Sequence, residues 1–227
     1  MSCSLVGSEM CIRDRFMAEN HLSLENRDYT FIFARSRESW SFSHPHYEHW
    51  LAAQTKIINL AKFCQSLDPD GITVYLASNP FIKYTSTEVI KLAQLFQIKK
   101  PPETMDLVSS LEDAINDYFQ RRDAKKTKNG DIILVLVDKI SNEQKSLINL
   151  IKNATHKIDL IPTTKNSYEL GISFLQIGED LITKEHLTYL DDRLVEIGVK
   201  HDIVDTKPWY KIKEKFITDV LTHALTD

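Results

Sequence analysis

The chain has 227 residues, of which 42% are hydrophobic and 26% charged, and its formal net charge at pH 7 is −4. A chain of this length and apolar content can bury one large core, as globular domains do. No basic run is long enough to follow a phosphate backbone, and no apolar run approaches the ~20 residues needed to cross a bilayer, so we expect neither a nucleic acid nor a membrane as a partner.

The first residues read differently from the rest of the chain. Residues 1–16 include Glu9-Met10-Cys11-Ile12-Arg13-Asp14, which resembles a translated sequencing-adaptor end. A signal peptide is the alternative, but its apolar stretch would be too short and charges follow it directly. We therefore expect residues 1–16 to be a non-native leader that contributes no packed element. Residues 17–26 are expected to be an N-terminal extension, and residues 27–227 a single domain.

Strands and helices alternate along the presumed domain. Tyr29–Phe33 is apolar or aromatic at almost every position, as in a central strand covered on both faces. Apolar residues recur at helical spacing from about Tyr47 to Ser66, which predicts a helix that ends at the turn Asp68–Gly71. Cys64 lies on the apolar side of this helix and is interpreted as a buried structural thiol. A lone cysteine in the domain fits a reducing compartment, so we expect a cytoplasmic protein.

The middle of the chain is predicted to add a hairpin and two helices. Ile72–Ala77 reads as a strand and is followed closely by a short one, Phe81–Tyr84, which together predict a hairpin at the edge of the sheet. Ser86 is the expected cap of the next helix, whose apolar face includes Ile90. A further helix is expected to start near Asp106.

The second half continues the alternation. Five basic residues precede Asn129-Gly130 and are interpreted as a solvated helix end and turn: Arg121, Arg122, Lys125, Lys126 and Lys128. Asp131–Val137 is the most hydrophobic strand, and Ser141–Gln144 reads as a capping box that opens a helix. Gly171–Ile177 and the short segment Asp202–Val204 are the last predicted strands.

This alternation predicts the fold class. Strands that alternate with helices of about 10–20 residues imply a mainly parallel sheet with helices on both faces. We therefore expect an α/β, doubly wound, Rossmann-like domain with a six-stranded sheet. One edge strand, the second of the predicted hairpin, is expected to be antiparallel.

Several stretches resemble those of stand-alone microbial von Willebrand factor type A domain proteins. Besides the strand at Tyr29 they are Asp70–Leu76, Asp113–Arg121, Ile172–Gly178 and His201–Thr206. The resemblance implies a metal-ion-dependent adhesion site at the carboxyl ends of the central strands. Hydroxyls and carboxylates of such a site hold Mg²⁺ or a similar ion, and an acidic side chain of a partner protein completes the coordination.

Carried over to this chain, the resemblance implies a degenerate site. The residues that match metal-ligand positions are Ser36, Glu38, Thr104 and Asp138. Ala34 stands where the family has its first aspartate, Glu38 replaces a serine, and Lys139 replaces a common glycine. The favoured interpretation is a metal-free site in which Arg35, Arg37 or Lys139 pairs with Asp138. Weak binding of Mg²⁺ or another divalent cation is the alternative.

Two further constellations lie near this site. His44, His46 and His49 are dense enough to suggest zinc or copper binding, but Pro45 interrupts the segment, and a solvent-facing polar loop is the favoured interpretation. Ser36 has no Gly-x-Ser-x-Gly elbow around it, which argues against a hydrolase nucleophile.

The predicted function is that of a protein–protein interaction module and not of an enzyme. Arg35, Arg37 and Trp40 are the predicted partner-binding residues, and Trp40 in particular could be an exposed anchor. The alternative is a metal-dependent or serine hydrolase built on the same loops. A deep polar pocket over Ser36 and Asp138 would favour that enzyme, and a flat or convex rim would favour the binding module.

Overall fold

The computed structural model describes residues 24–96, 104–126, 128–140, 143–160, 169–194, 196, 198–199, 202–212 and 217–226. The predicted leader, residues 1–16, and most of the predicted extension lie outside these ranges. The residues just before the first strand are tied to the domain by backbone hydrogen bonds, from the Asn26 N–H to the Leu67 carbonyl and from the Asn129 N–H to the Asn26 carbonyl.

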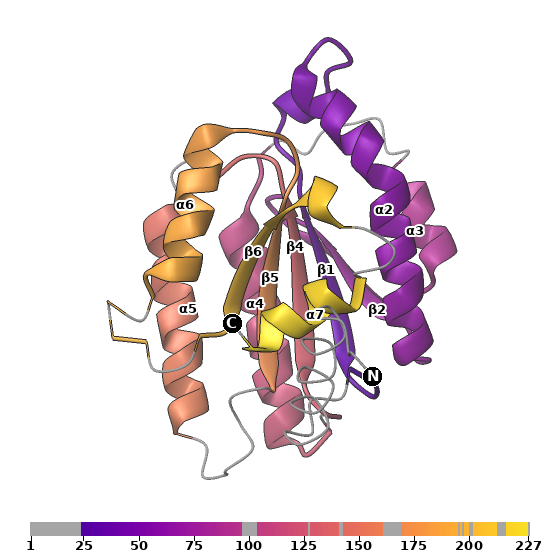
Figure 1. The fold of residues 1–227 in the computed structure, drawn as a ribbon. Helices are drawn as coiled ribbons and strands as arrows, with labels where there is room; N and C mark the ends of the chain where they lie inside the picture. The colour runs from indigo at the N-terminus through magenta and orange to yellow at the C-terminus, as the bar shows by residue number, and fades with distance from the viewer. Residues whose placement is uncertain are drawn as a thin grey trace, which may run out of the picture.

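The centre of the fold is a six-stranded sheet with the order β3-β2-β1-β4-β5-β6 (Figure 1). Its strands are β1 (Asp28–Ala34), β2 (Ile72–Leu76), β3 (Ile82–Thr87), β4 (Asp131–Val137), β5 (Leu170–Gln176) and β6 (Val204–Pro208). β3 pairs antiparallel with β2, and all other neighbours are parallel. Every residue of β4 and β5 is buried, as expected for strands that are covered on both faces.

Helices cover both faces of the sheet (Figure 1). One face carries α2 (Pro45–Leu67), α3 (Val89–Leu95) and α7 (Ile217–Thr226), and the other carries α4 (Leu107–Asp123), α5 (Gln144–Asp159) and α6 (Leu181–Asp192). Short 3-10 helices, η1 (Glu38–Trp40) and η4 (Trp209–Lys211), follow β1 and β6. Successive residues of β1 join opposite cores: Phe31 and Phe33 pack toward α2, and Ile32 and Ala34 toward α4. The predicted doubly wound α/β fold with one antiparallel edge strand is confirmed.

Several local predictions need correction. α2 begins at Pro45 instead of Tyr47, because proline at the first helical position fits the helix and the His44 side chain caps it by accepting a hydrogen bond from the His46 N–H. Ser86 is not a helix cap; it belongs to β3 with a φ of 48°, and Glu88 occupies the cap position of α3. Ile90 is 72% exposed and does not face the core.

The predicted capping box of α5 is only partly described. Ser141 and Asn142 lie outside the described residues. Glu143 occupies the N-cap position and makes no side-chain hydrogen bond of the capping type. The burial of Cys64, by contrast, is confirmed: its side chain is fully buried in the core on the α2 face, and this burial raises the pKa of the thiol.

At the β6 edge of the sheet, alternate backbone N–H groups are bonded to carboxylates or absent. On β6 the Val204 N–H donates to Asp202, the Thr206 N–H donates to Asp191, and Pro208 has no N–H to offer. Carboxylates and proline on an edge strand prevent another strand from pairing with it. The β6 edge is therefore closed to strand addition.

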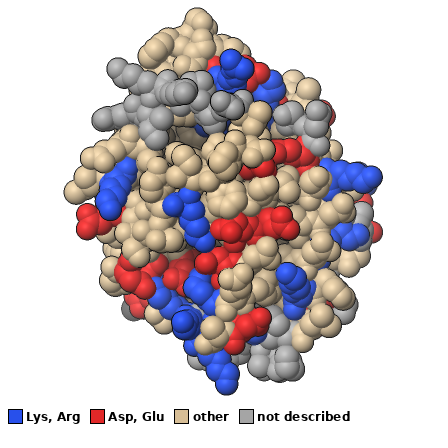
Figure 2. Space-filling model, turned by 180° about the vertical axis from the view of Figure 1, so that it is seen from behind, with Lys and Arg blue, Asp and Glu red and all other residues tan. Residues whose placement is uncertain are grey.

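The surface carries charges of both signs. Figure 2 shows a face on which acidic side chains form a band, with basic side chains interspersed among them. Among the described residues, no helix combines the length and apolar character that crossing a bilayer requires.

Candidate functional site

The candidate site lies where the strand order reverses. β1 contacts β2 on one side and β4 on the other, and the chain leaves the carboxyl ends of β1 and β4 toward opposite faces of the sheet. Such a crevice is the usual ligand position in doubly wound folds. Here it is formed by residues 35–44 after β1, the first turn of α2, and Asp138 directly after β4, at the top of Figure 1.

Asp138 is the centre of the site, and its carboxylate is fully buried. Oδ1 accepts a hydrogen bond from the Ser36 backbone N–H at 2.9 Å. Oδ2 accepts from the Ser36 hydroxyl and from the Trp50 indole N–H, each at 2.9 Å. Ser36 and Asp138 therefore meet although they are 102 residues apart in the sequence. Trp50, whose ring packs in the core on the α2 face, is therefore also a polar partner of the carboxylate.

His46 faces the same carboxylate. Its Nδ1 lies 3.7 Å from Asp138 Oδ2, and its side chain is only 16% exposed. The neighbouring carboxylate raises the pKa of His46 above its ordinary value, although burial opposes the positive charge. The prediction of a solvent-facing histidine loop is therefore wrong: the segment forms the cap and first turn of α2, because Pro45 starts the helix.

The three histidines do not converge on one point. His44 Nδ1 accepts the hydrogen bond that caps α2. His49 Nδ1 lies against Gly178 after β5, where a Cβ would approach it to 2.7 Å, so this close contact and the φ of +100° both require glycine. Within the described ranges, groups of three or more metal-ligating atoms close to one another include none of these histidines. The described geometry gives no support to the zinc alternative.

The predicted cationic partners of Asp138 are engaged elsewhere. The Arg35 guanidinium donates to the Ser39 carbonyl at 2.6 Å and lies 4.1 Å from the centre of the Trp40 ring. The Lys139 ammonium pairs with Glu38 at 2.9 Å on the surface. Arg37 is exposed. In the part of the chain that the structure describes, the ion-pair partner of Asp138 is His46 alone.

The other two predicted metal ligands do not join Asp138 either. Glu38 is 45% exposed, and its bond to Lys139 lowers the pKa of its carboxyl group. Thr104 is exposed, and its carbonyl accepts a hydrogen bond from the Asn79 N–H at 3.1 Å, which ties the start of α4 to the loop after β2. Neither residue is among the described hydrogen-bond partners of Asp138.

Most of the lone pairs of Asp138 are engaged by hydrogen-bond donors of the protein. A metal ion needs lone pairs directed at it, whereas N–H and O–H groups point their hydrogens at both oxygens of Asp138. Two of these donors, the Ser36 N–H and the Trp50 indole, have no lone pair to offer a cation in return. Three of the about four lone-pair sites of the carboxylate are therefore occupied by protein donors.

Two clefts that the described residues form lie away from this centre. Ser36 is 5% exposed. A cleft of about 520 Å³ lies between α6 and β6 and includes Gln176, Thr206 and Lys207 among its lining residues. A second, of about 420 Å³, lies along α6. Neither of these clefts is lined by Ser36 or Asp138.

Comparisons with known proteins add no relative: no protein-family model matches the chain, and no curated protein matches it. The von Willebrand factor type A assignment therefore remains a prediction from sequence motifs.

The contact between His46 and Asp138 predicts a pH-dependent stability. Because the pKa of His46 is raised in the folded state, its contribution is complete below the ordinary histidine pKa of 6.5 and is lost as the pH rises through the higher folded-state value. We expect the difference in free energy of unfolding between the wild type and His46→Asn to shrink between about pH 5 and pH 8. Urea titrations of both proteins across this range measure it, with His156→Asn as the control. If the difference in free energy of unfolding between the wild type and His46→Asn grew as the pH rose, the predicted direction of the effect would be wrong.

Proposed function

We propose that this protein is a metal-independent protein-binding module whose contact surface is the segment of residues 35–44. The observation that supports this most is the set of three hydrogen bonds that the buried Asp138 carboxylate accepts from Ser36 and Trp50. These hydrogen bonds fix the loop after β1 to the end of β4 and to α2 without requiring an ion. Preorganisation of this kind reduces the entropy that a loop loses when it binds a partner.

The chemistry of the segment suits a protein partner. Phe42 is 74% exposed, and its ring centroid lies 4.7 Å from that of Tyr47. The Tyr47 ring therefore supports an aromatic side chain that is accessible to a partner. Arg37, which is exposed, and the Glu38–Lys139 pair add charged groups to the same region after β1. Aromatic and arginine residues dominate the energetics of protein interfaces. Arg35 and Trp40, which are also predicted to bind the partner, are half-buried and stack on each other within the same segment.

The resemblance to von Willebrand factor type A domains is consistent with this proposal, because that family binds proteins at the same edge of the sheet. The chain would use the same location with different chemistry. Rigid hydrogen bonds and an aromatic anchor would replace the shared cation.

A hydrolase is a weaker candidate. A serine nucleophile needs a base at its hydroxyl, and that base is in turn oriented by a third group. Here the Ser36 hydroxyl donates to the Asp138 carboxylate, and the closest approach of His46 that we observe is to that carboxylate. His46 therefore lies beside the carboxylate and not beside the serine hydroxyl, where a general base would have to be. Ser36 is also buried.

The proposal is tested by capture and then by affinity. Proteins from the source organism are captured on the wild type, on Phe42→Ser/Arg37→Glu, and on Ile90→Ser, which alters an equally exposed residue of α3. A captured candidate is purified and titrated in EDTA and in millimolar Mg²⁺. We expect the double variant to bind more than about tenfold more weakly, a loss of ~1.4 kcal/mol, with Ile90→Ser unchanged. Binding that requires Mg²⁺, or that Ile90→Ser weakens equally, would contradict the proposal.

A further inference from the structure

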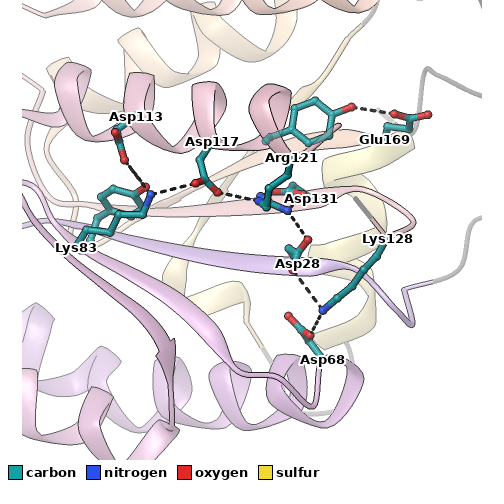
Figure 3. A network of polar contacts seen from close by, with 11 residues as sticks. Asp28, Asp68, Lys83, Asp113, Asp117, Arg121, Lys128, Asp131 and Glu169 are labelled. Carbon is teal, nitrogen blue, oxygen red and sulfur yellow. Dashed lines mark hydrogen bonds and ion pairs between the residues drawn. The ribbon is translucent and has the colours of Figure 1, made fainter. Parts of the chain in front are cut away.

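A second group of charged side chains lies at the opposite, amino-terminal edge of the sheet (Figure 3). Asp28 begins β1, Asp68 and Asp70 precede β2, and Lys128 precedes β4. Because these three strands are parallel, their starting points meet at one edge. The basic residues Arg121 and Lys128, interpreted from the sequence as a solvated helix end and turn, are instead held by carboxylates at this edge.

Three carboxylates surround a single ammonium group. Lys128 Nζ lies 2.5 Å from Asp68 Oδ1, 2.5 Å from Asp70 Oδ1 and 3.3 Å from Asp28 Oδ1. One oxygen from each of the three aspartates lies within 4.8 Å of the others. Figure 3 shows the Asp28 and Asp68 carboxylates turned toward the Lys128 ammonium. The ammonium therefore lies where a metal ion between these carboxylates would bind.

Asp68 adds an independent observation. Its side chain is 1% exposed, yet Oδ2 has no hydrogen-bond partner among the described residues. A buried carboxylate oxygen without a partner is costly, since a group removed from water normally regains its hydrogen bonds within the protein. Lys128 satisfies only Oδ1. The remaining lone pairs of Asp68 are therefore free to coordinate a ligand with positive charge.

Carboxylates outnumber cationic side chains in the surrounding network. The described ion pairs link six carboxylates with three cationic side chains: Asp28, Asp68, Asp70, Asp113, Asp117 and Asp131 with Lys83, Arg121 and Lys128. Arg27 adds one more positive charge, which interacts with Asp131. Arg121 is shared by Asp28, Asp117 and Asp131, so it cannot compensate Asp28 alone. A divalent ion would reduce this excess of negative charge.

We propose that Asp28, Asp68 and Asp70 form a divalent-cation site in which the Lys128 ammonium competes with the ion. Ca²⁺ is the best-fitting cation. One oxygen from each aspartate lies within 4.8 Å of the others, which is close enough for all three to contact one ion. Ca²⁺ accepts irregular sets of carboxylate oxygens, whereas Mg²⁺ demands near-ideal octahedral geometry and gives up its water reluctantly.

The exposure of Asp70 to solvent and the backbone turn at Gly71 also suit a cation site. Asp70 is 70% exposed, so an ion can reach the cluster from solvent and Lys128 can move out. Gly71, with a φ of +98°, allows the sharp turn that places Asp70 beside Asp68. The site is independent of the proposed partner surface, which lies at the other edge of the sheet.

Calorimetric titration of metal-free full-length protein with CaCl₂ and with MgCl₂ tests this proposal. We expect one Ca²⁺ per chain, bound more tightly than Mg²⁺. Asp70→Asn changes an exposed residue and is expected to weaken Ca²⁺ binding by about tenfold or more, because it removes one charged ligand. Lys128→Met removes the competitor and is expected to strengthen binding by about tenfold or more. Lys83→Met, which alters a cation of the same network away from the three aspartates, should leave the affinity unchanged.

Four results would overturn the proposal. The first is the absence of Ca²⁺ binding to the wild type at millimolar concentration, including the case in which only Lys128→Met binds, since the ammonium would then be a permanent substitute. The second is an affinity that Asp70→Asn leaves unchanged, which would place the ion elsewhere. The third is an equal effect of Lys83→Met and Lys128→Met, which would indicate a general effect of charge. The fourth is tighter binding of Mg²⁺ than of Ca²⁺. Circular dichroism melts verify that each variant is folded.

Discussion

Replacement of Asp138 by alanine is expected to lower the free energy of unfolding by about 3–5 kcal/mol. The fully buried carboxylate accepts hydrogen bonds from the Ser36 N–H, the Ser36 hydroxyl and the Trp50 indole. Removal of the acceptor leaves these donors buried without partners, and each orphaned donor costs about 1–3 kcal/mol. The sum is reduced because the Ser36 hydroxyl can rotate toward another acceptor.

Urea unfolding monitored by tryptophan fluorescence and by circular dichroism measures this loss. Asp192→Ala is the matched control, since it removes an exposed aspartate at the end of α6 and is expected to change stability by less than about 0.5 kcal/mol. Asp138→Asn keeps the shape of the side chain but turns one acceptor into a donor, so an intermediate or equal loss is expected. A change below about 1 kcal/mol for Asp138→Ala would mean that these hydrogen bonds do not hold the loop.

The sheet could be predicted because its inner strands carry a strong pattern. After their first aspartate, β1 and β4 are apolar or aromatic at every position except Thr30, a pattern typical of strands that are covered on both faces. The polar edge strands were harder to delimit. β3 continues through Thr85-Ser86-Thr87, a segment of a polar composition that reads as loop. The last strand was predicted at Asp202–Val204, but β6 begins only at Val204 and runs through the equally polar Thr206-Lys207-Pro208. Their extended form comes from pairing with β2 and β5, which a local pattern does not contain.

The candidate site was only partly predictable for a similar reason. Ser36 and Asp138 follow strands whose carboxyl ends meet in a parallel sheet, so their proximity could be expected. The role of Trp50 could not, because helical spacing places its ring toward the core but does not say where the indole N–H finds an acceptor. The role of His46 had a usable signal: Pro45 favours the first position of a helix, which would have placed His46 in the first turn.

No local sequence pattern predicts the network of ion pairs at the amino-terminal edge of the sheet. Asp68 and Asp70 belong to a turn motif, and Lys128 to a basic stretch, and each is explained by its immediate neighbours. Only the pairing of β1 with both β2 and β4 brings them together. Ion pairs between strand ends depend on sheet order, so they become visible only when the topology is known.

Ala34→Asp tests whether the missing aspartate is what separates this site from a metal site. Ala34 is fully buried among apolar side chains that pack between the sheet and α4. In metal-free buffer we expect the variant to lose about 2–5 kcal/mol of stability, because a charged group is buried near Asp138 without a partner. Millimolar Mg²⁺ should restore about 1–3 kcal/mol if it binds with a Kd of tens of micromolar, since ligand binding to the folded state alone stabilises it.

The comparison is made in an Asp70→Asn background, which weakens the proposed cation site at the other edge of the sheet. Thermal melts with EDTA and with Mg²⁺ are recorded for the parent, for Ala34→Asp, and for Ala34→Asn as the uncharged control. We expect Mg²⁺ to stabilise Ala34→Asp only, because the added carboxylate is the one change that supplies a new anionic ligand. Equal stabilisation of the parent would mean that Glu38 leaves Lys139 and coordinates the ion, and the proposed metal-independent site would then be wrong.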